Sequence, residues 1–150
     1  MISRMRKTRV NPLEIVQDNV FVRIKKRKIV PHEFVLEALA DLSPRTNPMF
    51  GCLAVYVADK IALILRDRSS NTADNGVWLA TTEEHHESLR HEFPNMRSIR
   101  LLGKKGTGWQ VLPVDAPDFE ESALRACELI LNGDYRIGKV PKAKRRKRAR

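Results

Sequence analysis

Residues 49–65 decide the fold, and they read Met49-Phe50-Gly51-Cys52-Leu53-Ala54-Val55-Tyr56-Val57, then Ala58-Asp59-Lys60, then Ile61-Ala62-Leu63-Ile64-Leu65. The first and third groups are rich in aliphatic and β-branched residues, and the group between them is a short polar turn. Two such runs separated by three turn residues predict an antiparallel β-hairpin. A hairpin is stable only as part of a larger sheet, so more strands are expected on either side of it.

Three further strands and three helices are predicted from the rest of the sequence. The strands are expected at residues 77–80, 97–102 and 109–113. The helices, in which apolar residues recur at helical spacing, are expected at residues 31–42, 81–93 and 115–133. Thr81 and Glu84 are three residues apart at the start of the middle helix, which predicts a capping box.

The resulting order of elements is α-β-β-β-α-β-β-α. Hairpins favour an antiparallel sheet, and the helices need an apolar surface to cover. We therefore predict an α+β fold, a two-layer sandwich with a mostly antiparallel sheet and helices on one face. One core is expected to contain Val35, Leu39, Leu53, Val55, Leu63, Leu65, Trp78, Leu89, Val111, Phe119, Cys127 and Ile130.

Length and composition suit a single intracellular domain. The 150 residues match one domain, and 42% of them are hydrophobic, which is enough for a core. No apolar run approaches the ~20 residues of a membrane span. Two cysteines cannot build a disulfide framework, and the charged N-terminal residues are not followed by an apolar stretch that would suggest secretion. These features predict a cytoplasmic protein with no membrane partner.

The net charge of +10 is concentrated at the two ends of the chain. Residues 1–28 carry nine Lys/Arg and two acids, a charge of +7, and residues 139–150 carry eight Lys/Arg and no acid. The residues between them carry −5. We predict a basic N-terminal arm at residues 1–28, a single α+β domain at residues 29–138, and a disordered basic tail at residues 139–150.

Cationic arms suit a nucleic-acid backbone, because phosphate contacts release counterions from it. The Gly-rich turn at residues 103–108 carries two more lysines, which suit either a phosphate contact or, more simply, a hairpin turn. Trp109, next to this turn, is suited either to stacking on a nucleobase or to packing in the hydrophobic core. The candidate nucleic-acid-binding residues are Arg23, Lys25, Lys26, Arg27, Lys28, Lys104, Lys105, Lys142, Lys144, Arg145, Arg146, Lys147, Arg148 and Arg150.

Catalytic and metal-binding patterns are missing from the sequence. His86 and His91 are five residues apart, whereas a helical zinc motif needs a spacing of four. The Gly-rich turn lacks the spacing of a nucleotide-binding P-loop. Cys52 and Cys127 have the pattern of small core residues. We therefore expect no catalytic residue, no metal and no cofactor.

The run Arg45-Thr46-Asn47-Pro48-Met49-Phe50-Gly51, followed by the hairpin, resembles the TfoX N-terminal domain. Here Cys52 stands where that family usually has a second glycine. Residues 83–93 and the later Gly103-Lys104 with Trp109 are similar to the MmcQ/YjbR group. The two resemblances cover roughly residues 31–135. They imply an α+β fold, a bacterial cytoplasmic setting and no known catalysis. TfoX proteins are linked to competence regulation, a role that a lone domain of this kind does not inherit, and the YjbR-like group is often labelled DNA-binding.

Two functions remain open at this point. The first is a small regulatory or binding protein that contacts DNA or RNA through its basic arms. The second is a protein–protein interaction module of the TfoX N-terminal type, either with another protein or as a homodimer, in which the arms supply only solubility and local charge.

Overall fold

The computed structural model describes residues 29–101 and 108–141 of the chain. The chain divides into two units, residues 1–30 and 31–150, and of the first unit the structure describes Ile29 and Val30 alone. The predicted N-terminal arm and the predicted tail from residue 142 onward therefore lie outside the described residues.

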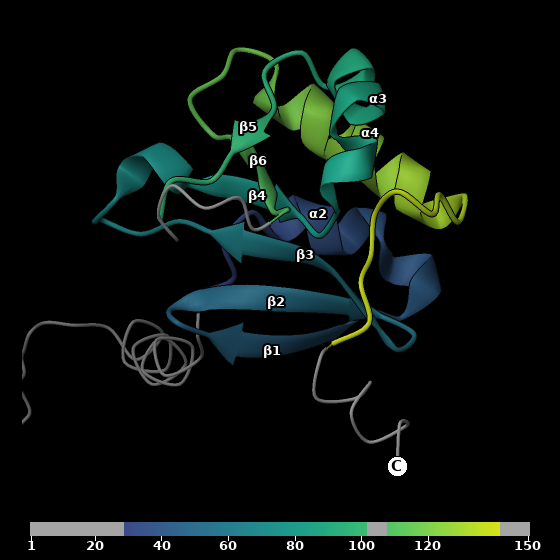
Figure 1. Ribbon diagram of the computed structural model, residues 1–150. Coiled ribbons are helices and arrows are strands. Elements are labelled where there is room, and N and C mark those ends of the chain that lie inside the picture. The colour runs from purple at the N-terminus through teal and green to yellow at the C-terminus, as the bar shows by residue number, and fades with distance from the viewer. Residues whose placement is uncertain (1–28, 102–107, 142–150) are drawn as a thin grey trace, which may run out of the picture. The chain divides into compact units, whose positions relative to one another are not determined.

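A six-stranded antiparallel sheet forms one layer of the second unit (Figure 1). Its strands lie in the spatial order β1-β2-β3-β4-β6-β5. They are β1 (Arg45–Met49), β2 (Cys52–Val57), β3 (Lys60–Arg66), β4 (Gly76–Leu79), β5 (Arg97–Ser98) and β6 (Gln110–Pro113). The predicted α+β class is confirmed.

The helices form the second layer and lie on one side of the sheet (Figure 1). The α-helices are α2 (Glu33–Ala38), α3 (His86–Glu92) and α4 (Phe119–Leu131). Short 3-10 turns accompany them at η2 (Ala40–Leu42), η3 (Thr72–Asp74) and η4 (Glu83–His85). None of the helices in the described ranges is long and apolar enough to cross a membrane.

The structure contains a strand before the predicted hairpin that the sequence analysis did not predict. Residues 45–49 form β1, which pairs with β2 in register from Met49 opposite Cys52 to Arg45 opposite Tyr56. The predicted strand at residues 49–57 is thus broken at Phe50 and Gly51, where both φ angles are positive. Pro48 made β1 hard to predict, because proline within a sequence run argues against a strand. Proline is tolerated mainly in edge strands, and β1 lies at the edge of the sheet.

All three α-helices are shorter than predicted. The helix expected over residues 31–42 is α-helical only to Ala38, and its last turn tightens into η2. The predicted capping box is wrong, because η4 begins after Thr82 without a side-chain cap and the Thr81 hydroxyl contacts the Thr82 carbonyl instead.

The buried apolar residues form two clusters rather than the single core that was predicted. Alternate side chains of a strand point to opposite faces of its sheet. On the helical face, Leu63 and Leu79 pack with residues of α2, α3 and α4. On the opposite face, Ile64, Trp78 and Val111 form a second cluster. Trp78 and Val111 are therefore buried as predicted, but on the face that α2, α3 and α4 do not cover.

Replacing Leu63 by alanine is expected to lower the free energy of unfolding by about 2–5 kcal/mol. Leu63 is fully buried under the helices, so the change leaves a cavity in the larger cluster. Urea denaturation measures the loss. The control is Leu124→Ala on α4, where the side chain is 47% exposed and little should change. Equal losses in the two variants would contradict this placement of β3.

Arg136 fastens the segment after α4 to helix α3. Its guanidinium lies 2.7 Å from a carboxylate oxygen of Asp134 and 3.2 Å from one of Glu92. It also donates a hydrogen bond to the Ser88 hydroxyl. These contacts hold the pKa values of Glu92 and Asp134 below their ordinary range, with hydrogen bonds from Arg136 as the main cause in both.

Lowered carboxyl pKa values make part of the stability dependent on pH. The contribution is complete above the unfolded-state pKa values, about 4, and is lost as the pH falls through the lower folded-state values. Arg136→Gln should therefore destabilise the protein most near pH 7. Below pH 4, the difference in free energy of unfolding between the variant and the wild type should become smaller. Urea unfolding across this range measures this difference, with Arg90→Gln on α3 as control. If this difference in free energy stayed constant with pH, Arg136 would not be the cause of the lowered pKa values of Glu92 and Asp134.

Candidate functional site

The predicted nucleic-acid-binding residues all lie outside the described residues, in segments 1–28, 102–107 and 142–150. Their roles stay predictions. The described chain does show where two of these segments are attached. Segment 102–107 joins Leu101 to Gly108, and segment 142–150 follows Pro141. Lys139, the first residue of the predicted tail, pairs with Ile61 of β3, and its ammonium lies 5.8 Å from the centre of the Trp109 ring.

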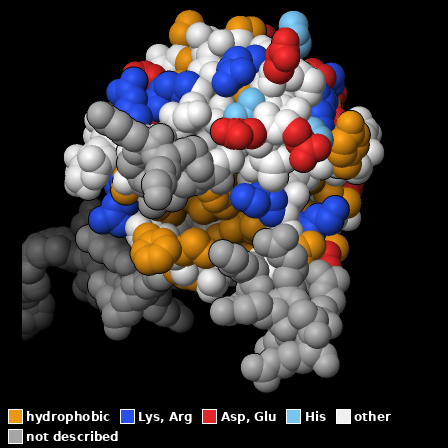
Figure 2. Space-filling view, in the orientation of Figure 1, with side chains coloured by type: hydrophobic (Ala, Val, Ile, Leu, Met, Phe, Trp, Pro, Cys, Tyr) orange, Lys and Arg blue, Asp and Glu red, His pale blue; other side chains and the backbone are white. Residues whose placement is uncertain are grey.

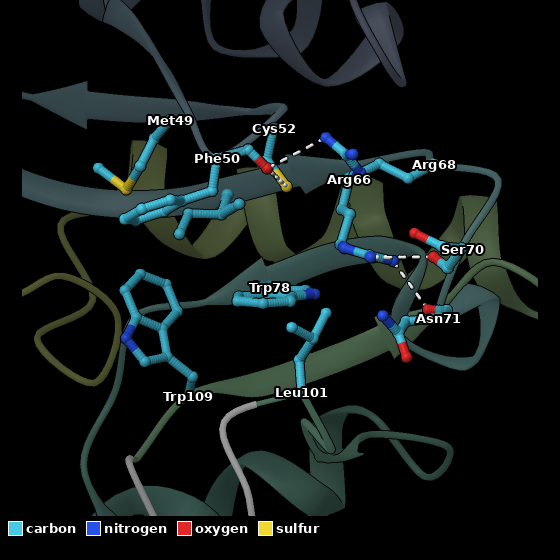
Figure 3. A pocket seen from close by; sticks show the side chains of 11 residues that line it. Met49, Phe50, Cys52, Arg66, Arg68, Ser70, Asn71, Trp78, Leu101 and Trp109 are labelled. Carbon is cyan, nitrogen blue, oxygen red and sulfur yellow. Dashed lines mark hydrogen bonds between the residues drawn. The ribbon is translucent and has the colours of Figure 1, made fainter.

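A pocket of about 510 Å³ lies on the face of the sheet that the described helices α2, α3 and α4 do not cover, which we call the helix-free face. This volume is in the range of small-molecule and cofactor sites. Figure 2 shows hydrophobic side chains gathered in a hollow, with Lys and Arg at its margins. The pocket is lined by Met49, Phe50, Cys52, Ile64, Arg66, Arg68, Ser70, Asn71, Trp78, Leu101 and Trp109 (Figure 3).

Trp78 and Ile64 lie opposite each other in the ladder between β3 and β4, so they share the helix-free face. The Trp78 indole nitrogen donates a 2.8 Å hydrogen bond to the Asp74 carbonyl, which fixes the orientation of the ring. The Trp109 ring lies 6.1 Å from it, tilted by 59°. The two tryptophans therefore form a continuous aromatic surface in the pocket.

The Asp74 carboxylate holds the pocket wall that contains Leu101. It is almost fully buried and accepts hydrogen bonds from the backbone amides of Arg100 and Leu101, at 2.9 and 2.7 Å. Arg97 pairs with it at 3.3 Å. Because these amides bond to a side chain instead of a neighbouring strand, β5 ends at Ser98, and the strand predicted to reach residue 102 is only two residues long.

Arg66 and Asn75 shape the loop that presents Arg68. The Arg66 guanidinium is buried, and it donates to the carbonyls of Ser70 and Asn71 and to the Asn75 side chain. The Asn75 amide in turn bonds to both the N–H and the carbonyl of Arg68, at 2.9 and 2.8 Å. The Arg66 guanidinium thus donates to three neutral oxygens, and the Cys52 thiol lies close to it as well.

The pocket has a positive electrostatic character. Neither Arg66 nor Arg68 forms an ion pair within the described part of the chain, and none of the lining side chains is acidic. The ion pairs of Glu92, Glu128 and Asp134 lie instead on or beside the helices. An anion is therefore favoured on the helix-free face.

Cys52 lies in the pocket, but it is not an activated thiol. Burial raises its pKa, and this effect outweighs the lowering by Arg66 and Arg68 nearby. Cys127 is buried under the helices, and burial raises its pKa to about 11. Since the thiolate is the nucleophilic form, these raised pKa values keep both thiols mostly protonated near neutral pH. Among the described residues, no three His, Cys, Asp or Glu side chains are grouped to hold a metal.

Phe50 occupies an unusual position in the turn between β1 and β2. Its φ is +52°, its side chain is 91% exposed, and its carbonyl accepts a 3.2 Å hydrogen bond from Arg68. Two-residue turns with two positive φ angles favour Asn-Gly. Gly51 fits this preference, and a Cβ there would collide with the Arg68 guanidinium. A bulky phenylalanine is strained in this conformation and gains almost nothing from burial.

Phe50→Asn should raise the free energy of unfolding by about 1 kcal/mol, because asparagine adopts a positive φ with less strain. The urea midpoint measures the gain. The matched control is Tyr135→Asn, another exposed aromatic, at a position without positive φ. A loss of stability in Phe50→Asn would show that Phe50 packs on the protein instead of being held out in solvent.

No family model, no curated protein and no solved structure matches this chain. The resemblance to the TfoX N-terminal domain and the MmcQ/YjbR group therefore stays a prediction. Sequence reasoning overlooked Arg66, Arg68 and Phe50 as site residues. A signal for them was present: Arg66 ends the most apolar strand, Arg68 follows it after Asp67, and Phe50 precedes a glycine at a strand end.

Proposed function

We propose that this protein is a non-enzymatic nucleic-acid-binding module that works in the cytoplasm, in a regulatory role. Its basic arms contact phosphates, and the helix-free face of its sheet lies toward the bound nucleic acid. The observation that carries this proposal is the position of Lys139. This residue starts the basic C-terminal stretch and lies over Trp109, at the edge of the positive pocket. A nucleic-acid strand bound by the tail can therefore continue across the pocket.

The separation of charge supports the same orientation. The central part of the chain is acidic overall, so a general attraction for DNA or RNA is not expected from it. The described residues that line its pocket nevertheless include two arginines and no acidic side chain, whereas acidic side chains lie on and around the helices. The helical side would repel a phosphate backbone, and the helix-free side would accept one.

A protein–protein interaction module is the second candidate. It is favoured by the mostly apolar lining of the pocket and by the exposed Phe50 side chain, which suit an apolar anchor from a partner or from a second copy. Binding of this kind depends weakly on salt, so it can be distinguished from phosphate binding.

Salt dependence tests the proposed function. If the arms engage about five phosphates of duplex DNA, the slope of log K against log salt should be near −4.5. Deleting residues 142–150 removes seven Lys/Arg, so the slope should become shallower by several units. Fluorescence anisotropy with unrelated sequences measures both slopes. A variant with the tail residues in scrambled order is the control and should bind like the wild type. Absence of binding to duplex and single strands at about 50 mM salt would contradict the proposal and favour the protein-interaction module.

A further inference from the structure

Phe50 destabilises the fold through its backbone conformation, and burial of its side chain does not offset this. Its backbone is in a conformation unfavourable for bulky residues, and its ring is 91% exposed. Strained residues of this kind persist at sites of function. Arg68 rests on the same turn and donates a hydrogen bond to the Phe50 carbonyl, so an exposed aromatic ring and a guanidinium are held together.

A buried guanidinium lies beside this pair. The Arg66 side chain is almost fully buried in the pocket wall, where its guanidinium donates hydrogen bonds to three neutral oxygens. Buried charges in proteins are usually compensated by an opposite charge. The positive charge of Arg66 thus adds to that of Arg68 and favours an anionic group at their end of the pocket.

The aromatic and cationic parts of the pocket are spatially separated. In Figure 3, Phe50 and Trp78 lie on opposite sides of the opening, Trp109 lies at its left end, and Arg66 and Arg68 lie at its right. A ligand that fits this arrangement has a flat ring joined to a negatively charged group. One nucleotide of a single strand has both, and the pocket volume of about 510 Å³ has room for it.

Building on the proposed nucleic-acid binding, we propose that this pocket is a subsite for one unpaired nucleobase. The base stacks on Phe50 and the tryptophans, and its phosphate binds Arg68, with Arg66 adding to the positive potential. Bases in a duplex are stacked and paired, so they cannot enter the pocket without being flipped out. The module therefore prefers single-stranded over duplex nucleic acid at equal charge.

Intrinsic fluorescence observes this pocket directly, because Trp78 and Trp109 are the two tryptophans of the chain and both line it. The full chain is titrated with a single-stranded thymidine oligonucleotide and, separately, with a duplex of the same number of phosphates. The single strand should quench the tryptophan emission in a saturable way. The duplex should bind through the arms and leave the emission nearly unchanged.

Two matched pairs of variants assign the contacts. Phe50→Asn should weaken binding of the single strand about 10-fold or more, with duplex binding unchanged, whereas Tyr135→Asn on the helical side should change neither. Arg68→Gln should weaken single-strand binding several-fold more than Arg90→Gln, which removes the same charge from α3. Circular dichroism confirms that each variant is folded.

The outcomes separate this proposal from the one it rests on. Equal binding of single strand and duplex, with salt dependence but no quenching, would leave the nucleic-acid function standing and overturn the base subsite. Unchanged single-strand affinity in Phe50→Asn would also overturn it. If the chain binds neither nucleic acid, both proposals fall. Quenching by an acidic aromatic peptide, but not by the oligonucleotide, would assign the pocket to a protein partner and overturn the subsite.

Discussion

The buried turn at Asp74 and Asn75 holds together the walls of the pocket. The Asp74 carboxylate fixes Leu101 through backbone amides, and the Asp74 carbonyl fixes the Trp78 ring. The Asn75 side chain fixes the backbone of Arg68 and contacts the Arg66 guanidinium. Since a buried polar group is costly without its partners, these hydrogen bonds must form together. A single turn therefore positions the aromatic, aliphatic and cationic walls relative to one another.

The placement of the helices leaves this pocket open. All three α-helices of the described chain cover the same face of the sheet, where they bury the larger apolar cluster. The opposite face retains a smaller apolar cluster around Ile64, Trp78 and Val111, and the pocket lies over part of it. The described part of the fold thus combines a helical side with a sheet face that none of its α-helices covers. The acidic residues of the helical side add an electrostatic preference for anions to approach the open face.

Local patterns were enough to predict the fold class, because strand alternation and helical spacing are properties of neighbouring residues. The same patterns failed where a distant side chain decides the outcome. The strand expected to reach residue 102 stops at Ser98 because Asp74, 24 residues before Ser98 in sequence, binds the amides of Arg100 and Leu101. Trp78 was expected in a common core because alternation shows that it is buried but not on which face. Arg66 and Arg68 were missed for the same reason, since their convergence with Phe50 exists only once β1, β2 and β3 are paired.

The central claim is that nucleic acid binds the helix-free face of the sheet. The most direct test is an amide and indole NMR titration of the full chain with a single-stranded oligonucleotide. The account predicts chemical-shift changes at the indole N–H groups of Trp78 and Trp109 and at the amides of Phe50, Arg68 and Leu101, with α3 and α4 little affected. Shifts concentrated on α3 and α4, or confined to residues 1–28 and 142–150, would contradict it.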